Sequence, residues 1–217
     1  KIVAKVRSTT LKRKIGDHVT FGDQEIKELS EFHVIWLRQD PPFDMGYITT
    51  THLLDMVGQE TLIVNNPFWV RNLPEKLLVL EFPELIPNTL ITRDLEEIKE
   101  FKREFGDIII KPLYGNGGAG VFRLKENDKN LVSLHELFSN ISSEPLIAQE
   151  FLPDVKNGDK RIILVDGEPV GAINRVPLAG ETRSNMHVGG QAQPVKLTER
   201  DREICKVIGP TLKNKGQ

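Results

Sequence analysis

Short apolar runs alternate along the chain with segments in which apolar residues recur at helical spacing. In the N-terminal third, residues 32–37 (FHVIWL) predict a buried strand, the turn RQDPPFD follows, and residues 45–57 predict a helix. A second strand is predicted at TLIVNNP, which ends in a turn at Pro67. A strand, a helix and a strand in this order predict a parallel pair, and the loops at the carboxyl ends of parallel strands are the usual place for ligands.

The alternation continues from about Leu73. A short helix starting with Pro74 is predicted at PEKLLVLEFP, because proline suits the first helical turn, and a short strand is predicted at TLIT. The segment RDLEEIKEFKREFG predicts an amphipathic helix that ends before Gly106, and its apolar face consists of Leu95, Ile98, Phe101 and Phe105. Residues 107–112 and 120–125 then predict two strands on either side of a glycine-rich turn.

The last third predicts one more strand, a hairpin and a helix. The strand is PLIAQEFLP, and the hairpin is KRIILVDGEPVGAINRVP, which turns at Asp166-Gly167, a dipeptide typical of tight hairpin turns. Thr198 to about Lys213 predicts a helix, and TERD supplies a capping box at its start. The whole pattern indicates an α/β (α+β) protein, and we expect three domains, at residues 1–73, 74–145 and 146–217.

Composition and charge narrow the class of protein. Of the 217 residues 39% are hydrophobic and 28% charged, which is the profile of a soluble globular protein rather than a disordered one. With 29 Lys and Arg against 31 Asp and Glu, the net charge of -2 provides no global attraction to nucleic acid or acidic membranes. We therefore expect no nucleic acid and no membrane as partner, and any anion site must be local.

The single cysteine, Cys205, excludes an internal disulfide and fits a reducing compartment, so we expect a cytoplasmic protein. It lies at helical spacing with apolar neighbours, which favours a buried structural thiol over a nucleophile. The five histidines lie far apart, without the spacing of metal ligands. Because the chain begins with Lys1 and stops abruptly at KNKGQ, we expect a piece of a longer protein that lacks both ends.

The stretch IIIKPLYGNGGAGVFRL carries the first candidate chemistry. Its glycines do not match GxxxxGK[ST], nor a GxGxxG that opens a helix, so neither the P-loop nor the Rossmann fingerprint applies. Glycines between antiparallel strands let backbone N–H groups approach phosphate oxygens, because no Cβ intervenes. Lys111, at the end of the strand that enters the loop, can place an ammonium beside the same phosphates. A flexible hairpin without a ligand is the alternative.

Three other stretches add candidates, each with a simple structural alternative. Lys76 offers a second cation for a polyphosphate, although a lysine in PEKL is usually a solvated surface residue. Glu150 lies beside backbone groups that can form hydrogen bonds with the edge of an adenine. The alternative is that Glu150 is an ordinary exposed strand residue. A cluster of positive and negative side chains stands directly before an apolar strand, at Asp159, Lys160 and Arg161. It is a candidate for ligand binding, and a solvated turn is the alternative.

Taken together in chain order, these stretches carry a family resemblance. The set RQDPPFD, IVNNP, EKLL, IIIKPLYGNGGAGVFRL, AQEFLP, GDKRIILVDGEPVGAINRVP and AGETRSNMHVGGQ closely resembles bacterial glutathione synthetase, of the ATP-grasp superfamily. The likeness covers nearly the whole chain. It implies an ATP-grasp fold with a partial N-terminal parallel α/β domain, and ATP-dependent ligation of γ-glutamylcysteine with glycine through an acyl phosphate. It also implies Mg²⁺ as cofactor and a homo-oligomer.

The resemblance also implies roles for individual residues. ATP would be bound by Lys76, Lys111, Gly115, Gly117, Gly118, Gly120, Glu150, Phe151, Leu152 and Asp159. The reacting phosphate and carboxylate would face Arg161 and Arg175. The peptide substrate would be bound by Arg38, Asp40 and Arg183. For Arg38 the alternative interpretation is a surface arginine on a rigid Pro-Pro turn.

Two further expectations concern the loop PLAGETRSNMHVGGQ and the metal. The loop is long and polar, so it is either disordered without function or a lid, with Arg183 in it and the Gly189-Gly190 pair as hinge. The Mg²⁺ ligands implied by the resemblance lie in a segment beyond Gln217, so we name no metal ligand in this chain. Two alternatives stay open: another ATP-grasp ligase with a different peptide or amino-acid pair, and a nucleotide-binding module without turnover.

Overall fold

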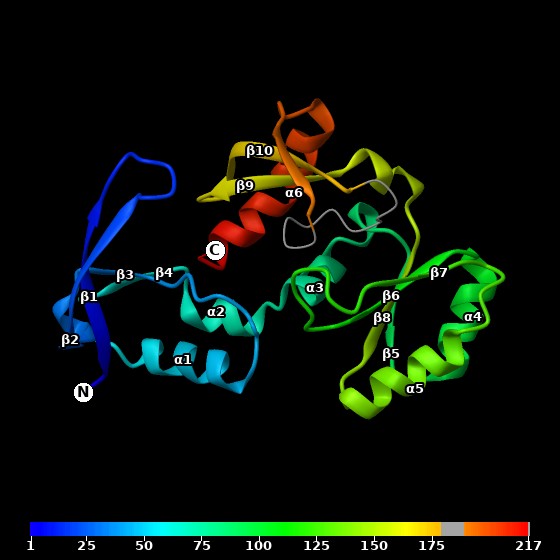
Figure 1. Ribbon diagram of the computed structural model, residues 1–217, viewed down its shortest axis with the longest axis horizontal. Helices are drawn as coiled ribbons and strands as arrows, with labels where there is room; N and C mark the ends of the chain where they lie inside the picture. Colours follow the sequence, from blue (N-terminus) through cyan, green and yellow to red (C-terminus); the bar gives the residue numbers. More distant parts are fainter. Residues whose placement is uncertain (179–188, 217) are drawn as a thin grey trace. The chain divides into compact units, whose positions relative to one another are not determined.

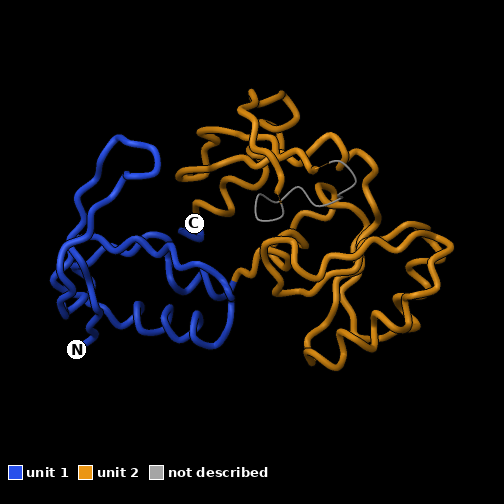
Figure 2. Tube along the Cα trace, in the orientation of Figure 1, with its two compact units in different colours: residues 1–72, 215–217 blue, residues 73–214 orange. Residues whose placement is uncertain are grey.

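The computed structural model describes residues 1–178 and 189–216 (Figure 1). It divides into two compact units, residues 1–72 with 215–217 and residues 73–214 (Figure 2). The expected division of the second region into two domains near residue 145 stays a prediction. Among the described residues no helix is both long and apolar enough to cross a membrane.

The first unit contains two small sheets. Strand β1 (Val3–Leu11) pairs antiparallel with β2 (Val19–Glu28), and the short helix η1 (Leu29–Glu31) follows. Strand β3 (Val34–Trp36) pairs parallel with β4 (Leu62–Val64), which confirms the predicted parallel pair. The helix between them, α1 (Met45–Asp55), confirms the helix predicted at residues 45–57, and α2 (Pro67–Asn72) completes the unit. The β1–β2 hairpin was not predicted.

The prediction that residues 32–37 form a buried strand was wrong about burial. Val34 and Trp36 are 56% and 69% exposed, and of the predicted strand only Leu37 is buried. In both β3 and β4 the middle residue is half-buried while its two neighbours are exposed. Successive side chains of a strand point to opposite faces, so one face of this two-stranded sheet is covered and the other is open among the described residues.

The second unit begins with short helices and a four-stranded antiparallel sheet. The helices are α3 (Glu75–Leu78), η2 (Val79–Glu81) and η3 (Pro83–Leu85). Pro74 is the N-cap of α3 and not its first residue, because its ψ of 129° is extended. The sheet has the order β5-β8-β6-β7, with β5 (Thr89–Thr92), β8 (Leu146–Glu150), β6 (Ile108–Pro112) and β7 (Phe122–Leu124).

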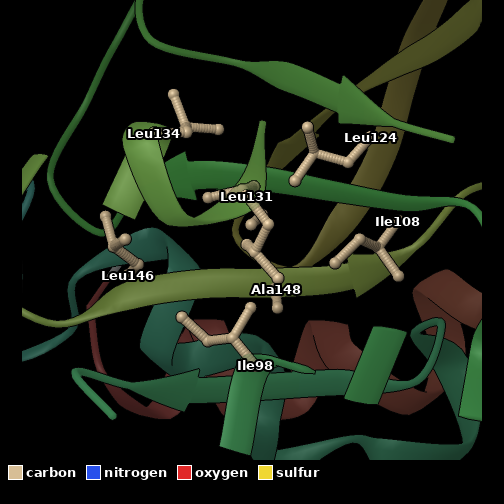
Figure 3. Close-up of a cluster of buried hydrophobic side chains, with 8 residues drawn as sticks. Ile98, Ile108, Leu124, Leu131, Leu134, Leu146 and Ala148 are labelled. Atoms are coloured by element: carbon tan, nitrogen blue, oxygen red, sulfur yellow. The ribbon is translucent and has the colours of Figure 1, made fainter. Parts of the chain in front are cut away.

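Helices α4 (Leu95–Phe105) and α5 (Leu131–Ile141) pack on one face of this sheet and form the main core (Figure 3). The sheet contributes alternate residues to the core: Ile108, Ile110, Leu124, Leu146 and Ala148. The predicted face of α4 is confirmed, since Ile98 is fully buried and its apolar neighbours pack on the cluster. Because strand side chains alternate, Ile109, Lys111 and Gln149 point to the opposite face, away from both helices.

A second, three-stranded sheet has the order β11-β10-β9. Its strands are β9 (Asp159–Val165), β10 (Glu168–Val176) and β11 (Gln191–Pro194), and the short helix η4 (Pro153–Asn157) leads into it. The predicted hairpin turn is confirmed: Asp166 and Gly167 have φ of 51° and 81°, the pair of positive values that a tight hairpin turn of this kind requires. Neither β11 nor α5 was predicted.

Helix α6 (Glu199–Asn214) packs against this hairpin. Its predicted capping box is present, because the Thr198 backbone N–H donates to Asp201 Oδ2 and the Asp201 N–H donates to Thr198 Oγ1. Cys205 is 3% exposed, so the predicted buried thiol is confirmed, and burial raises its pKa. Gly209 approaches the hairpin turn closely: a Cβ there would lie 2.3 Å from the carbonyl oxygen of Gly167.

Candidate functional site

A cavity of about 440 Å³ opens on the face of the four-stranded sheet that points away from α4 and α5. Strands β6 and β8 supply its floor, the glycine-rich loop covers part of it, and the segment after β8 forms its far wall. Six of the residues proposed from the sequence line it: Lys111, Gly118, Glu150, Phe151, Leu152 and Asp159. The fold therefore brings together residues that are up to 48 positions apart, since Lys111 and Asp159 mark the two ends of this set.

Lys111 is half-buried on β6, and its ammonium donates a 2.6 Å hydrogen bond to Gln149 Oε1. Burial is the largest cause that lowers the pKa of Lys111, and the positive charge of Lys76 is the second. Both causes disfavour the charged form of the Lys111 side chain. An anionic ligand would reverse them, so this lysine is arranged to meet negative charge.

Lys76 lies on α3 and reaches the glycine-rich loop. Its ammonium donates a 2.6 Å hydrogen bond to the carbonyl oxygen of Gly115 and lies 3.1 Å from Glu75 Oε1. The side chain of Lys76 is 21% exposed, whereas that of Glu75 is 82% exposed, so the ion pair is a solvated surface contact. Because its own side chain is mostly covered and bonded to the loop, Lys76 is not the solvated surface lysine that PEKL alone favours.

The glycine-rich loop uses its glycines for backbone conformations that other residues rarely adopt. Gly117, Gly118 and Gly120 have φ of 61°, 83° and 69°. A Cβ on Gly120 would also lie 3.0 Å from the Pro112 ring. The loop is held as an ordered turn, since the Ala119 N–H donates to the Asn116 carbonyl at 3.1 Å.

The far wall of the cavity is the chain that leaves β8. Glu150 Oε2 accepts a 3.0 Å hydrogen bond from the Asn88 amide, and the backbone N–H of Glu150 donates to the Asn88 carbonyl. The guanidinium of Arg123 lies 3.7 Å from the ring centroid of Phe151. Asp107 holds this guanidinium through its Nε and Nη2 and also accepts the Phe151 N–H at its backbone carbonyl.

Asp159, at the start of β9, closes the other side. Its carboxylate accepts a 2.8 Å hydrogen bond from Arg175 Nε and a second, short one from Arg175 Nη2. Arg175 lies opposite Asp159 in the strand pairing, and Arg161 lies opposite Ile173, two positions along. Since side chains two positions apart share a face, Arg161 and Arg175 lie on the same face of this sheet as Asp159.

The structure does not bring all proposed residues to the cavity. Lys76, Gly115, Gly117, Gly120, Arg161 and Arg175 are not among the residues that line it. Arg38 and Asp40 are exposed residues of the first unit, where the guanidinium of Arg38 lies 5.6 Å from the Trp36 ring centroid. Arg183 lies outside the described residues, as does most of the proposed lid.

Gln149 is one of the lining residues that the sequence did not indicate. The available signal was its position: it is the polar residue two places after Ile147 in a strand that is otherwise apolar up to Glu150. Lys160, which the sequence grouped with the charges of a possible site, instead donates to Asp201 on α6 at 2.5 Å. Among the described residues no group of three His, Cys, Asp or Glu side chains is placed to hold a metal ion.

Residues 75–217 match the family model of the prokaryotic glutathione synthetase ATP-grasp domain, and residues 1–71 match that of its N-terminal domain. The glutathione synthetase of Brucella melitensis is 60% identical over 215 residues, which are 99% of this chain and 69% of that protein. The glutathione synthetase of Mesorhizobium japonicum is 57% identical over 216 residues, which are 100% of this chain and 69% of that protein.

Solved structures show the same fold at low identity. The D-cycloserine synthetase DcsG aligns with a TM-score of 0.63 at 16% identity, over 88% of this chain and 68% of that one. The macrocyclase MdnC from Microcystis aeruginosa aligns with a TM-score of 0.59 at 24% identity, over 97% of this chain and 71% of that one. Together with the family matches, they show that the chain has the ATP-grasp fold and belongs to the prokaryotic glutathione synthetase family, whose members are ATP-dependent ligases that form glutathione.

Proposed function

We propose that the cavity beside Lys111 holds ATP, and that the chain uses it to activate the carboxylate of γ-glutamylcysteine for attack by glycine. The observation that carries this proposal is the meeting of two lysines at one glycine-rich loop. Lys111 and Lys76 are close enough for the charge of Lys76 to lower the pKa of Lys111, and each donates to a neutral oxygen. The carboxylate that pairs with Lys76 belongs to Glu75, whose side chain is 82% exposed, so it neutralises the two lysines only in part. Two cations brought together without full neutralisation favour a ligand with several negative charges, such as a triphosphate.

The reaction needs activation because the oxygen of a carboxylate is a poor leaving group. A carboxylate oxygen of γ-glutamylcysteine forms a bond to the γ-phosphorus of ATP while the bond from that phosphorus to the ADP oxygen breaks. The glycine amine then bonds to the acyl carbon, phosphate departs with the bonding electrons, and the amine loses a proton. Negative charge develops on the transferred oxygens at both steps, and fixed cations and backbone N–H groups stabilise it.

The residues of the chain divide this work as follows. Lys76, Lys111 and the loop with Gly115, Gly117, Gly118 and Gly120 hold the phosphates. Phe151 and Leu152 provide apolar surface for the adenine, and the backbone beside Glu150 provides hydrogen bonds to its edge. Asp159, oriented by Arg175, lines the same cavity and contacts the nucleotide there. Arg161 and Arg175 face the reacting phosphate and carboxylate, while Arg38, Asp40 and Arg183 bind the peptide.

Mg²⁺ is the cofactor expected for this chemistry, since it would neutralise the negative charge of the phosphates. The described carboxylates of this chain do not gather into a group that fits the ion by themselves.

We also propose a location and an assembly state for the protein, namely the cytosol and a homo-oligomer. The single buried thiol supports a reducing cytosol as the location, and sedimentation velocity tests the homo-oligomer.

The decisive assay is release of ADP with defined substrate pairs. We expect ADP release with γ-glutamylcysteine and glycine, and little with other peptide and amine pairs. Lys111→Ala should lower the rate by orders of magnitude, whereas Lys99→Ala should leave it unchanged, because Lys99 pairs with Glu96 on the exposed side of α4. Near-normal turnover by Lys111→Ala refutes the phosphate role of this residue.

A further inference from the structure

Three consecutive hydrogen bonds connect the cavity lysine to the backbone on the far side of β8. Lys111 Nζ donates to Gln149 Oε1 at 2.6 Å, and Gln149 Nε2 donates to Thr89 Oγ1 at 2.8 Å. Thr89 Oγ1 in turn donates to the Pro87 carbonyl oxygen at 2.7 Å. Thr89 and Gln149 are direct partners in the β5–β8 pairing, so the backbone places the two side chains beside each other.

The direction of this chain of bonds is fixed at both ends. A backbone carbonyl can only accept, and an ammonium can only donate. The single hydroxyl proton of Thr89 goes to Pro87, so toward Gln149 the hydroxyl can only accept. The amide of Gln149 must therefore turn its NH₂ group to Thr89 and its oxygen to Lys111. The reverse orientation would place amide N–H groups against an ammonium, donor against donor.

We propose that Thr89 is a positioning residue for Lys111, and that it acts through the orientation of the Gln149 amide. The proposal rests on the proposed function, in which Lys111 binds a phosphate of ATP. Within the described residues, Gln149 Oε1 is the hydrogen-bond acceptor of the Lys111 ammonium. Loss of the Thr89 hydroxyl removes what holds that oxygen in place, so the amide can rotate and the ammonium loses its anchor in a partly desolvated site.

Thr89 does not touch the ligand space itself, which separates this role from direct binding. It is half-buried on β5 and is not among the residues that line the cavity. Its hydroxyl contacts two lining residues, Gln149 and Pro87. Of these two routes, only the one through Gln149 reaches Lys111 and would change the pH at which ATP binding is lost. A merely structural role in the strand would change the stability of the fold, but not the pH at which ATP binding is lost.

The test compares Thr89→Val, which keeps the branched shape but lacks the hydroxyl, with Thr89→Ser, which keeps the hydroxyl. ATP affinity is measured by calorimetry across the alkaline range, and thermal unfolding is recorded for every variant. We expect Thr89→Val to weaken ATP binding roughly tenfold, the effect of about one lost hydrogen bond to a charged group. Its binding should also fall at lower pH than in the wild type, because the ammonium has lost its acceptor. Thr89→Ser should match the wild type in both respects.

Thr89→Ala covers the case in which valine disturbs the sheet, since it also lacks the hydroxyl and is smaller. Wild-type affinity and pH dependence in a folded Thr89→Val or Thr89→Ala variant overturns the inference. Lys111→Ala separates this failure from failure of the proposed function. If Lys111→Ala binds ATP normally, the phosphate role is wrong. If Lys111→Ala loses ATP while Thr89→Val keeps it, only the positioning role is wrong.

Discussion

The ammonium of Lys76 donates a 2.6 Å hydrogen bond to the carbonyl oxygen of Gly115, which lies 39 residues further along the chain. One side chain thus joins α3 to the glycine-rich loop at the point where the loop leaves β6. Lys76 thereby has two possible functions in nucleotide binding. It supplies a positive charge beside Lys111, and it holds the start of the loop whose next glycines have positive φ.

Substitution of Lys76 by methionine removes the charge and the hydrogen bond while it keeps an unbranched side chain. We expect ATP affinity to fall roughly ten- to a hundredfold, the range for one lost charge-assisted contact. Calorimetric titration of ATP measures the change. Lys99→Met is the matched control, because Lys99 pairs with Glu96 on its own helix and does not line the cavity. Equal affinities of Lys76→Met and the wild type contradict a role of this ammonium in binding.

The lowered pKa of Lys111 predicts that ATP binding takes up protons in alkaline solution. At a pH between its folded-state pKa and the ordinary lysine value of 10.5, Lys111 is neutral in a large fraction of the ATP-free molecules. Phosphate stabilises the charged form, so binding raises the pKa and adds a proton. The apparent affinity should therefore fall as the pH rises through the folded-state pKa.

Calorimetry in buffers with different ionisation enthalpies measures this proton uptake directly. Lys111→Arg is the informative control, because a guanidinium stays protonated over the whole range. Its binding should show no uptake from this position. If the wild type and Lys111→Arg take up the same number of protons, the titrating group is not Lys111.

The pair of Asp107 and Arg123 predicts a stability difference that depends on pH. The hydrogen bond from Arg123 is the largest cause that lowers the pKa of Asp107, followed by the backbone N–H of Glu126. A carboxyl group whose pKa is lowered by folding stabilises the fold above its unfolded value of 3.8, and this contribution is lost as the pH falls through the folded value. Asp107→Asn should thus lower the free energy of unfolding by about 0.5–1 kcal/mol at neutral pH, as expected for a partly exposed pair.

Urea unfolding at neutral and at strongly acidic pH checks this expectation. The two proteins should differ at neutral pH and converge in acid. Because Arg123 also lies over Phe151, Asp107→Asn should weaken ATP binding at neutral pH as well, through a looser cavity wall. A stability difference that is the same at both pH values argues against the ion pair as its cause.

The close approach of α6 to the β9–β10 turn predicts that Gly209 tolerates no side chain. The Cβ of an alanine would lie 2.3 Å from the Gly167 carbonyl oxygen, so helix and turn must separate. We expect Gly209→Ala to lower the free energy of unfolding by about 2 kcal/mol, in the range of overpacking substitutions. Gly171→Ala on β10 is the control, because its Cβ would meet nothing within 4 Å. Equal unfolding midpoints of the two variants contradict the tight contact.

Local patterns predicted those elements whose structure is decided locally. The Asp166-Gly167 turn and the apolar face of α4 depend on neighbouring residues, and both are confirmed. The exposure of Trp36 was missed, because burial depends on which layers cover a sheet and not on the strand itself. The β1–β2 hairpin was missed because its apolar residues are few and interspersed with charged and hydroxyl residues.

In the site, too, local patterns predicted some residues, whereas contacts between residues distant in the sequence were missed. Lys111 and the glycines were found because they stand together in one stretch of sequence. The bonds that give Lys111 its environment join residues 38 and 60 positions apart, from Lys111 to Gln149 and from Gln149 to Thr89, and no local pattern carries that information. The fold alone brings these three side chains into contact.

The most direct measurement is a crystal structure of the protein with a non-hydrolysable ATP analogue. We predict that the triphosphate lies between the ammonium groups of Lys76 and Lys111, under the loop with Gly118, and that the adenine lies against Phe151. A nucleotide that binds elsewhere, or whose phosphates make no contact with Lys111, would contradict this prediction.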